Sequence, residues 1–118
     1  MTASPISDLS PILMASRATV TFGKSPDDLK TIPVDEHFFT GYRKTVVSEN
    51  ETLVKIEIPH LCQNAYFLAF KQSKRKEDDI AIVNAAFYIG FEKNSATVKA
   101  RDSYTAIFGT LHLLQFSG

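Results

Sequence analysis

The stretch FKQSKRKEDDIAIV, from Phe70 to Val83, decides how the rest of the chain is interpreted. Four basic residues are followed by three acidic residues, and an apolar run begins at once. A charge block of this kind is usually a solvated loop. Here it lies between two apolar segments, residues 65–70 and 81–91, so its charges are expected at the rim of a folded unit. Cations beside anions at such a rim suit a ligand of mixed character, such as an anionic cofactor with an electron-poor ring.

The composition indicates one globular domain. The chain has 118 residues, of which 44% are hydrophobic and 22% charged, unlike a disordered segment. The formal net charge is zero, so no overall field favours nucleic acid or an anionic membrane. No apolar run approaches the length of a membrane span, and the start MTASPISDLS lacks the pattern of a signal peptide. We therefore expect neither a nucleic-acid nor a membrane partner.

The single cysteine, Cys62, excludes an internal disulfide and fits a reducing compartment. We expect a cytoplasmic location, with the peroxisome as the alternative. The three histidines, His37, His60 and His112, are scattered along the sequence. Each is more often a surface or capping residue than a ligand, so no metal site is predicted.

The first third of the chain predicts a short helix and a hairpin. Ser7 or Asp8 can cap a helix that begins near Pro11, where a proline loses no needed donor. A strand, a turn and a return strand are predicted over residues 18–22, 23–28 and 29–34.

The middle predicts one weak helical element and one clear strand. Asp35 can cap a short helical segment, DEHFF, with two phenylalanines to bury. Residues 52–58 alternate, with Val54, Ile56 and Ile58 on one face of the strand.

The last half predicts mostly strands. They are expected at residues 65–71, 84–92, 97–100 and 104–108, the last two being possible parts of one long strand. One helical turn is predicted at residues 80–83, capped by Asp79, and a hairpin turn at residues 92–95. Residues 111–118 are apolar but carry no pairing signal. The whole predicts an α+β fold, mostly antiparallel, with few short helices.

Chemistry-bearing motifs are few. No nucleophile–base pair, GxSxG, HExxH, P-loop or Rossmann glycine pattern occurs. Tyr42 with Arg43 and Lys44 could clamp an anion, although an exposed turn would look the same. The residues alone support a soluble α+β domain with a candidate rim for an anionic ligand.

Four collinear blocks resemble the flavin-binding portion of the xanthine dehydrogenase/oxidase family of molybdenum hydroxylases. They are TASPISDLSPILMAS (2–16), FFTGYRKT (38–45), IEIP (56–59) and FKQSKRKEDDIAIVNAA (70–86). The first resembles the segment that follows the family's glycine-rich phosphate loop, and the resemblance extends to about residue 109. The related aldehyde oxidases share the architecture as a close variant, but the acidic pair in EDD favours xanthine dehydrogenase.

The resemblance implies two parts. Residues 1–60 would be the tail of a vanillyl-alcohol-oxidase-like, PCMH-type FAD-binding domain. Residues 61–118 would begin the antiparallel-sheet C-terminal domain found in CO dehydrogenase flavoproteins. In the family, purine hydroxylation at a molybdopterin centre sends electrons through 2Fe–2S clusters to FAD, and then to NAD⁺ or O₂. The molybdopterin and clusters would lie outside this segment, and the full-length family is a homodimer.

Site residues follow from the resemblance position by position. Thr2, Ser7 and Asp8 match positions near the FAD pyrophosphate and ribose, where a carboxylate can accept from a hydroxyl. Leu53 matches an apolar contact to the flavin or adenine. Lys71 matches a lysine at the isoalloxazine ring, where a cation favours electron density on the ring.

Two further residues are implied near the electron acceptor. Asp78 matches an acid on the mobile loop beside the flavin, which in the family influences whether NAD⁺ can approach. Tyr42 matches a tyrosine that lines the nicotinamide side. Lys76 stands where vertebrate relatives usually carry arginine, which weakens the case for an arginine that holds the loop by stacking.

The ends of the chain depart from the family. The glycine-rich segment should precede Thr2, and a helical subdomain should follow Gly109. These departures lead us to expect a fragment that binds FAD weakly or not at all and does not turn over alone. The alternative hypothesis is a non-enzymatic remnant or splice product that acts, if at all, as a protein-interaction module through exposed strand edges.

Overall fold

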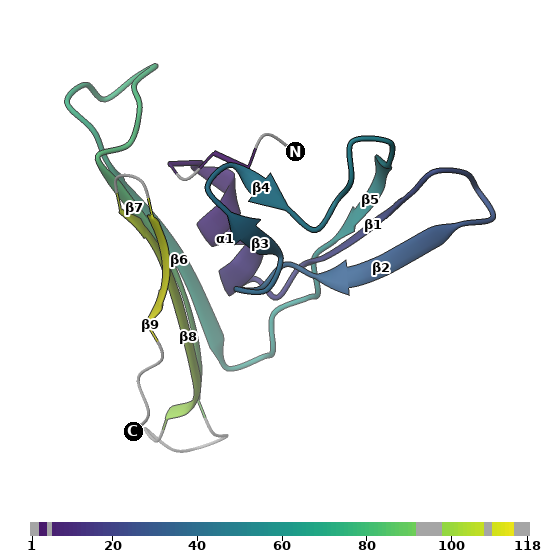
Figure 1. The fold of residues 1–118 in the computed structure, drawn as a ribbon. Helices are drawn as coiled ribbons and strands as arrows, with labels where there is room; N and C mark the ends of the chain where they lie inside the picture. Colours follow the sequence, from purple (N-terminus) through teal and green to yellow (C-terminus); the bar gives the residue numbers. More distant parts are fainter. Residues whose placement is uncertain (1–2, 5, 92–97, 108–109, 115–118) are drawn as a thin grey trace.

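The computed structural model describes residues 3–4, 6–91, 98–107 and 110–114, the last two ranges by their backbone. A short helix and a three-stranded sheet form the N-terminal part, and a four-stranded antiparallel sheet forms the C-terminal part (Figure 1). The helix lies between the two sheets and packs against the second (Figure 1). The predicted α+β, mostly antiparallel fold is confirmed.

Helix α1 (Leu9–Ala15) forms where the sequence predicts it. At its start the Ser7 hydroxyl accepts a hydrogen bond from the Ser10 amide at 3.2 Å, whereas Asp8 makes no side-chain capping bond. The side chains of Leu13 and Met14 are buried, so α1 contributes directly to the core. The helix is short, and its stability must come from this packing rather than from its own hydrogen bonds.

The predicted hairpin is confirmed as β1 (Thr19–Gly23) and β2 (Leu29–Pro33), which pair antiparallel. β5 (Thr52–Glu57) pairs with the other side of β1, giving the order β2-β1-β5. β1 is therefore the central strand, and its buried side chains Val20 and Phe22 join the core. On β5 the faces divide as predicted, since Lys55 and Glu57 form an ion pair at 3.0 Å on one of them. The side chains of Val54 and Ile56 on β5, and of Ile58 just after it, are exposed.

The segment DEHFF forms a turn, so the predicted helical element is wrong. The Asp35 carboxylate accepts from the His37 amide at 2.9 Å, and the Asp35 carbonyl accepts from the Phe38 amide at 3.1 Å. The aspartate thus closes a turn instead of starting a helix, because Phe39 already enters a strand. That strand, β3 (Phe39–Gly41), pairs with β4 (Lys44–Thr45). Phe38 is 1% exposed and anchors the turn in the core.

The second sheet has the order β6-β7-β8-β9. Its strands are β6 (Ala65–Gln72), β7 (Val83–Phe91), β8 (Val98–Ile107) and β9 (Thr110–Leu114). Residues 98–107 form one long strand, so of the two expectations for this region the single strand holds and the two short strands do not. β9 pairs with β8, so residues 111–114 have a strand partner although their sequence carries no pairing signal. The predicted turn at 92–95 lies outside the described residues.

The predicted helical turn at residues 80–83 is also wrong. The Ile82 amide donates to the Gln72 carbonyl at 2.8 Å, which continues the β6–β7 ladder toward the loop. Asp79 does not cap a helix, because its carboxylate accepts from the Arg75 amide at 2.9 Å, back across the loop. The connection between β6 and β7 is therefore a closed loop with extended ends.

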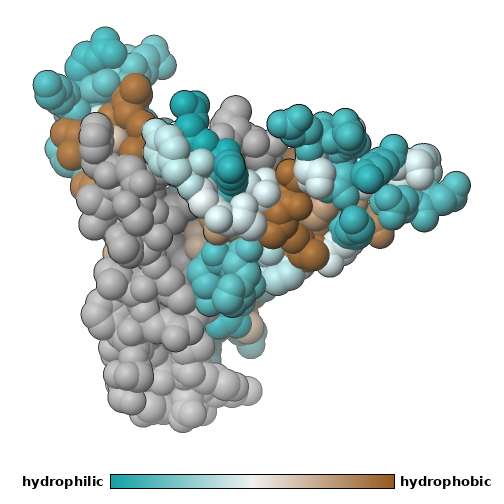
Figure 2. Space-filling view, viewed as in Figure 1, coloured by the Kyte–Doolittle hydropathy of each residue, from teal (hydrophilic) through white to brown (hydrophobic). Residues whose placement is uncertain are grey.

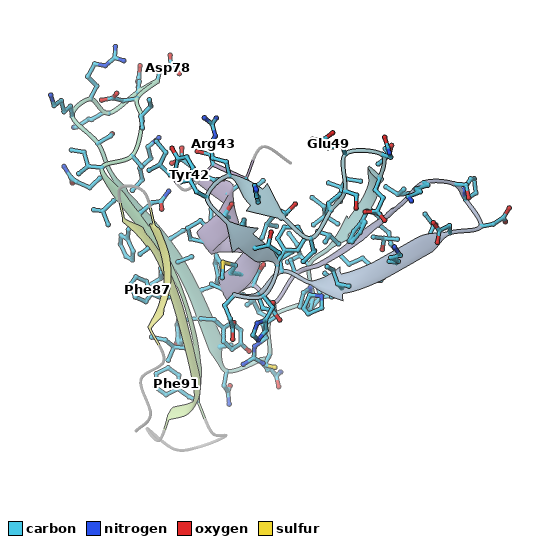
Figure 3. The ribbon with its side chains drawn as sticks, viewed as in Figure 1. Tyr42, Arg43, Glu49, Asp78, Phe87 and Phe91 are labelled. Atoms are coloured by element: carbon cyan, nitrogen blue, oxygen red, sulfur yellow. The ribbon has the colours of Figure 1, made fainter. Side chains whose placement is uncertain are left out.

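The two faces of the second sheet differ in what covers them. Along β7 the side chains alternate between buried and half-buried, and Asn84, Ala86 and Tyr88 are buried on the side of α1. On the other face Phe87 and Phe91 point away from α1 (Figure 3). There Phe70 packs edge-on against Phe87 with ring centroids 6.1 Å apart. The core of the described chain therefore lies between α1 and the inner faces of both sheets.

Candidate cofactor site

Asp8 and Lys71, both predicted to contact FAD, meet where α1 begins. Lys71 on β6 and Asn84 on β7 are direct cross-strand partners, so their side chains leave the sheet on the same face. Both reach Asp8: the Lys71 Nζ lies 2.7 Å from Oδ2, and the Asn84 Nδ2 lies 3.2 Å from Oδ1. Strand register in one part of the chain thus places two hydrogen-bond donors around a carboxylate of the other part.

Asn84 also holds the backbone before the helix. Its Nδ2 donates to the Ser7 carbonyl at 3.0 Å. Because the Ser7 carbonyl and the Asp8 carboxylate can only accept, the amide nitrogen must face them, and this assigns the orientation of the Asn84 amide. The other amide atom, Oδ1, is buried and has no hydrogen-bond partner among the described residues.

Asn84 was not predicted as a site residue. The only signal in the sequence is a polar residue in the otherwise apolar strand VNAAFYIGF. Its role depends on the register between β6 and β7 and on the docking of α1, and the sequence pattern specifies neither.

The cluster is open to a ligand. The side chains of Lys71 and Asp8 are 36% and 55% exposed, whereas Asn84 is 4% exposed. The carboxylate retains lone pairs that can accept from hydroxyl groups, and the ammonium can donate to an electron-rich atom. This set of donors and acceptors fits a ligand that carries both hydroxyl groups and an electron-rich or anionic group, as FAD does.

The structure does not gather the other predicted FAD residues at this cluster. Leu53 lies on β5 and packs against the core, and Figure 1 shows β5 on the side of α1 away from β6 and β7. Thr2 lies outside the described residues. These assignments remain predictions from the resemblance.

Asp78 lies at the tip of the β6–β7 loop, where hydrophilic residues gather (Figures 2 and 3). Its backbone is left-handed, with φ of 48°, and its carbonyl accepts from the Arg75 guanidinium at 2.9 Å. Within the described part of the chain, its side chain makes no hydrogen bond or ion pair. The loop is therefore closed by Arg75 and Asp79, and the Asp78 carboxylate is left available.

Tyr42 is 73% exposed on the turn between β3 and β4. The next residue, Arg43, is left-handed with φ of 56°. Arg43 and Lys44, which the sequence suggests as an anion clamp, line a cavity of about 430 Å³ together with Ser48 and Glu51. The amide of Ser48 and the ammonium of Lys30 bond to the Glu51 carboxylate and lower its pKa, so this wall of the cavity stays anionic at neutral pH.

A second side-chain cluster lies on the inner face of β7. The Arg17 guanidinium carbon lies 5.0 Å from the centroid of the Tyr88 ring. Two causes raise the pKa of the Tyr88 hydroxyl above its usual value: mainly a hydrogen bond with the exposed Cys62, and to a smaller extent burial.

Within the described residues, no helix is long and apolar enough to span a bilayer. In the same ranges no three histidine, cysteine, aspartate or glutamate side chains converge as metal ligands would.

Comparison with known proteins identifies the class of this chain. The family model described as the FAD binding domain in molybdopterin dehydrogenase matches residues 1–61, and the chain belongs to this family. The model described as the CO dehydrogenase flavoprotein C-terminal domain matches residues 68–112. Asp8 lies in the first match, and Lys71 and Asn84 lie in the second. The cluster therefore joins the two matched regions.

Among individual proteins, the chain is similar to xanthine dehydrogenases. The chain is 50% identical over 99 residues to xanthine dehydrogenase/oxidase of Gallus gallus, covering 84% of this chain and 7% of the relative. It is 39% identical over 112 residues to xanthine dehydrogenase 1 of Arabidopsis thaliana, covering 95% of this chain and 8% of the relative. The chain is thus a xanthine dehydrogenase-like segment from the FAD portion of a molybdenum hydroxylase, and it spans less than a tenth of these relatives' length.

Solved structures agree on the fold. Carbon monoxide dehydrogenase from Hydrogenophaga pseudoflava matches with a TM-score of 0.81 at 22% identity, over 95% of this chain and 38% of that one. Quinoline 2-oxidoreductase from Pseudomonas putida 86 matches with a TM-score of 0.73 at 21% identity, over 95% and 37%. The predicted combination of a PCMH-type FAD-binding tail and a CO-dehydrogenase-flavoprotein-like sheet is confirmed, and so are the family resemblance and FAD as the cofactor.

Proposed function

We propose that this chain supplies one wall of the FAD site in an oxidoreductase that hydroxylates purines, as its xanthine dehydrogenase relatives suggest. The observation that carries the proposal is the meeting of Asp8 and Lys71 at 2.7 Å, because it joins the two family-matched regions at one point. FAD, when bound, supplies the exchange of electrons. The chain supplies binding groups and charge.

Each predicted residue has a role that its chemistry supports. Asp8 accepts from a cofactor hydroxyl, with Ser7 beside it, and Lys71 donates toward the electron-rich edge of the flavin. Leu53 offers an apolar contact, and Thr2 a hydroxyl for a phosphate oxygen. The exposed Tyr42 and Asp78 would face the NAD⁺ that accepts electrons, since a carboxylate attracts a cationic nicotinamide ring.

The remaining functions belong to the whole protein. Molybdopterin and 2Fe–2S clusters would be bound by other parts of it, NAD⁺ or O₂ would take the electrons, and the assembly would be a cytoplasmic homodimer. We place the boundary between the two domains at residues 60 and 61.

Titration of FAD into the purified chain, followed by flavin fluorescence, tests the central claim. The sequence leaves weak binding and no binding open, and the exposed Asp8–Lys71 pair favours the first. We expect saturable binding with a dissociation constant of about 10–100 µM, since few of the contacts come from this chain. Asp8→Asn should weaken it further, while Asp27→Asn on the exposed β1–β2 turn should not. Absence of saturable binding at millimolar FAD would refute the proposal, and sub-micromolar binding would refute the expectation of weak binding.

A further inference from the structure

Asn84 is a buried polar residue that packing alone does not explain. It stands on the inner face of β7, where the alternate positions are Ala86, Tyr88 and Gly90. The next residue on this face, Ala86, is apolar and 0% exposed, so an apolar side chain suits this layer. The amide instead leaves its Oδ1 buried with no partner among the residues that the structure describes, an unfavourable state that native proteins seldom keep without a reason.

The donors of Asn84 show what that reason is. Its Nδ2 carries two hydrogens, one directed to the Ser7 carbonyl and one to the Asp8 carboxylate. Both acceptors lie immediately before α1. The amide therefore fixes the backbone at residue 7 and the side chain of residue 8 with a single group.

The hydrogen bond from Asn84 Nδ2 to Asp8 Oδ1 orients the whole Asp8 carboxylate. With Oδ1 held by Asn84, Oδ2 turns toward Lys71, whose ammonium lies 2.7 Å away. Asp8 and Lys71 are both partly exposed, whereas Asn84 is 4% exposed and lies behind them. A ligand would touch the two charged groups, and Asn84 would act through them.

We propose that Asn84 is the positioning residue of the FAD site: it holds Asp8, and through Asp8 it holds Lys71, in the arrangement that meets the cofactor. This rests on the proposed function. A carboxylate anchored in advance loses less freedom on binding, so the anchor contributes to affinity without touching the ligand. The remaining lone pairs of Asp8 then face the cofactor hydroxyls in one orientation.

A double-mutant cycle on FAD affinity tests the coupling. Asn84→Ala should raise the dissociation constant about tenfold, within the range found for residues of one hydrogen-bond network. In the Asp8→Ala background the same substitution should change it less than about twofold, because Asn84 would have nothing left to orient. Asn84→Asp keeps the shape but replaces donors by acceptors, so it should weaken binding more than Asn84→Ala.

The controls separate positioning from folding. Asn50→Ala removes an exposed asparagine in the turn before β5 and should leave FAD affinity unchanged. Thermal unfolding of each variant without FAD shows that it is folded at the assay temperature. If Asn84→Ala does not fold, the side-chain amide resonances of Asn84 in the unaltered chain provide the test. They should shift on addition of FAD, and the shift should be lost in Asp8→Ala.

The outcomes are distinct. If the unaltered chain binds FAD and the two substitutions act independently, or the Asn84 amide resonances stay fixed at saturating FAD, the positioning role is wrong and the FAD site stands. If the unaltered chain does not bind FAD, the proposed function fails and the positioning role fails with it.

Discussion

The ammonium of Lys71 lies 2.7 Å from the carboxylate of Asp8, across 63 residues of sequence. Both side chains are at least one-third exposed, and ion pairs in that setting contribute about 0.2–1 kcal/mol or less. The pair is therefore a poor device for stability. The pair is better explained as a preformed hydrogen-bond donor and acceptor, with no net charge, at the edge of a ligand site.

Replacing Lys71 should separate binding from stability. We expect Lys71→Ala to lower the free energy of unfolding by less than about 1 kcal/mol, because the pair is exposed. The dissociation constant for FAD should rise about three- to tenfold, because the flavin loses its cation. Denaturant unfolding and FAD titration on the same protein measure the two effects. Lys74→Ala, on the exposed loop, is the matched control, and a large stability loss in Lys71→Ala would show that the pair is structural.

The sequence predicts the local elements of this chain better than their long-range contacts. The helix near Pro11 and the hairpin of β1 and β2 follow from capping, alternation and turn residues that lie close together. The sequence predicts Asp35 and Asp79 to be helix caps, yet each closes a turn or loop with a nearby amide. An aspartate next to apolar residues favours either outcome, and tertiary packing decides between them.

The candidate site shows the same limit. The family resemblance predicts Asp8 and Lys71 as separate site residues. It does not predict their contact, which depends on where α1 docks on the second sheet. Asn84 and the pairing of β9 with β8 escaped prediction because both depend on register between strands, which no local pattern encodes.

Gly23 offers a stability test in the first hairpin. A Cβ on this glycine would clash with the carbonyl oxygen of Asp28, a backbone atom that cannot move without disturbing the turn. Gly23→Ala should therefore lower the free energy of unfolding by about 1–3 kcal/mol. Gly41→Ala is the control, since a Cβ there would meet nothing within 4 Å. Equal denaturation midpoints for the two variants would contradict the tight β1–β2 turn.

Tyr88 should make stability fall at alkaline pH. Its hydrogen bond with Cys62 and its burial raise the pKa of the folded state above the ordinary 10.0. The folded protein keeps the phenolic proton longer than the unfolded chain, so the stabilisation is complete below pH 10 and is lost as pH rises through the folded value. Tyr88→Phe should remove this part of the alkaline decline. Denaturant unfolding of both proteins across this range measures it, with the exposed Tyr42→Phe as control, and parallel declines would show that Tyr88 does not titrate differently on folding.

Asp78 provides a test of the electron acceptor. Its side chain has no bonded partner in the described part of the chain, and the loop is held by Arg75 and Asp79 instead. No helix begins after Asp78 in the described residues, so its carboxylate is not occupied as a helix cap. Asp78→Asn is the appropriate change, because asparagine tolerates the left-handed backbone at this position while the charge is removed.

The measurement requires a complete enzyme, in which the part of this chain that matches the Gallus gallus relative replaces the corresponding segment of that relative. A unit charge at about 5 Å is worth about 3 kcal/mol at an effective dielectric of 20, and solvent screening on an exposed loop reduces this. We therefore expect Asp78→Asn to slow NAD⁺ reduction about three- to tenfold. Purine oxidation with an artificial acceptor should keep its rate, because in the proposed function that chemistry occurs at a molybdenum centre in another part of the enzyme. Asp79→Asn, which loosens the loop, should affect both acceptors if it affects either. Equal losses with both acceptors in Asp78→Asn, or no loss with either, would rule out an electrostatic role toward NAD⁺.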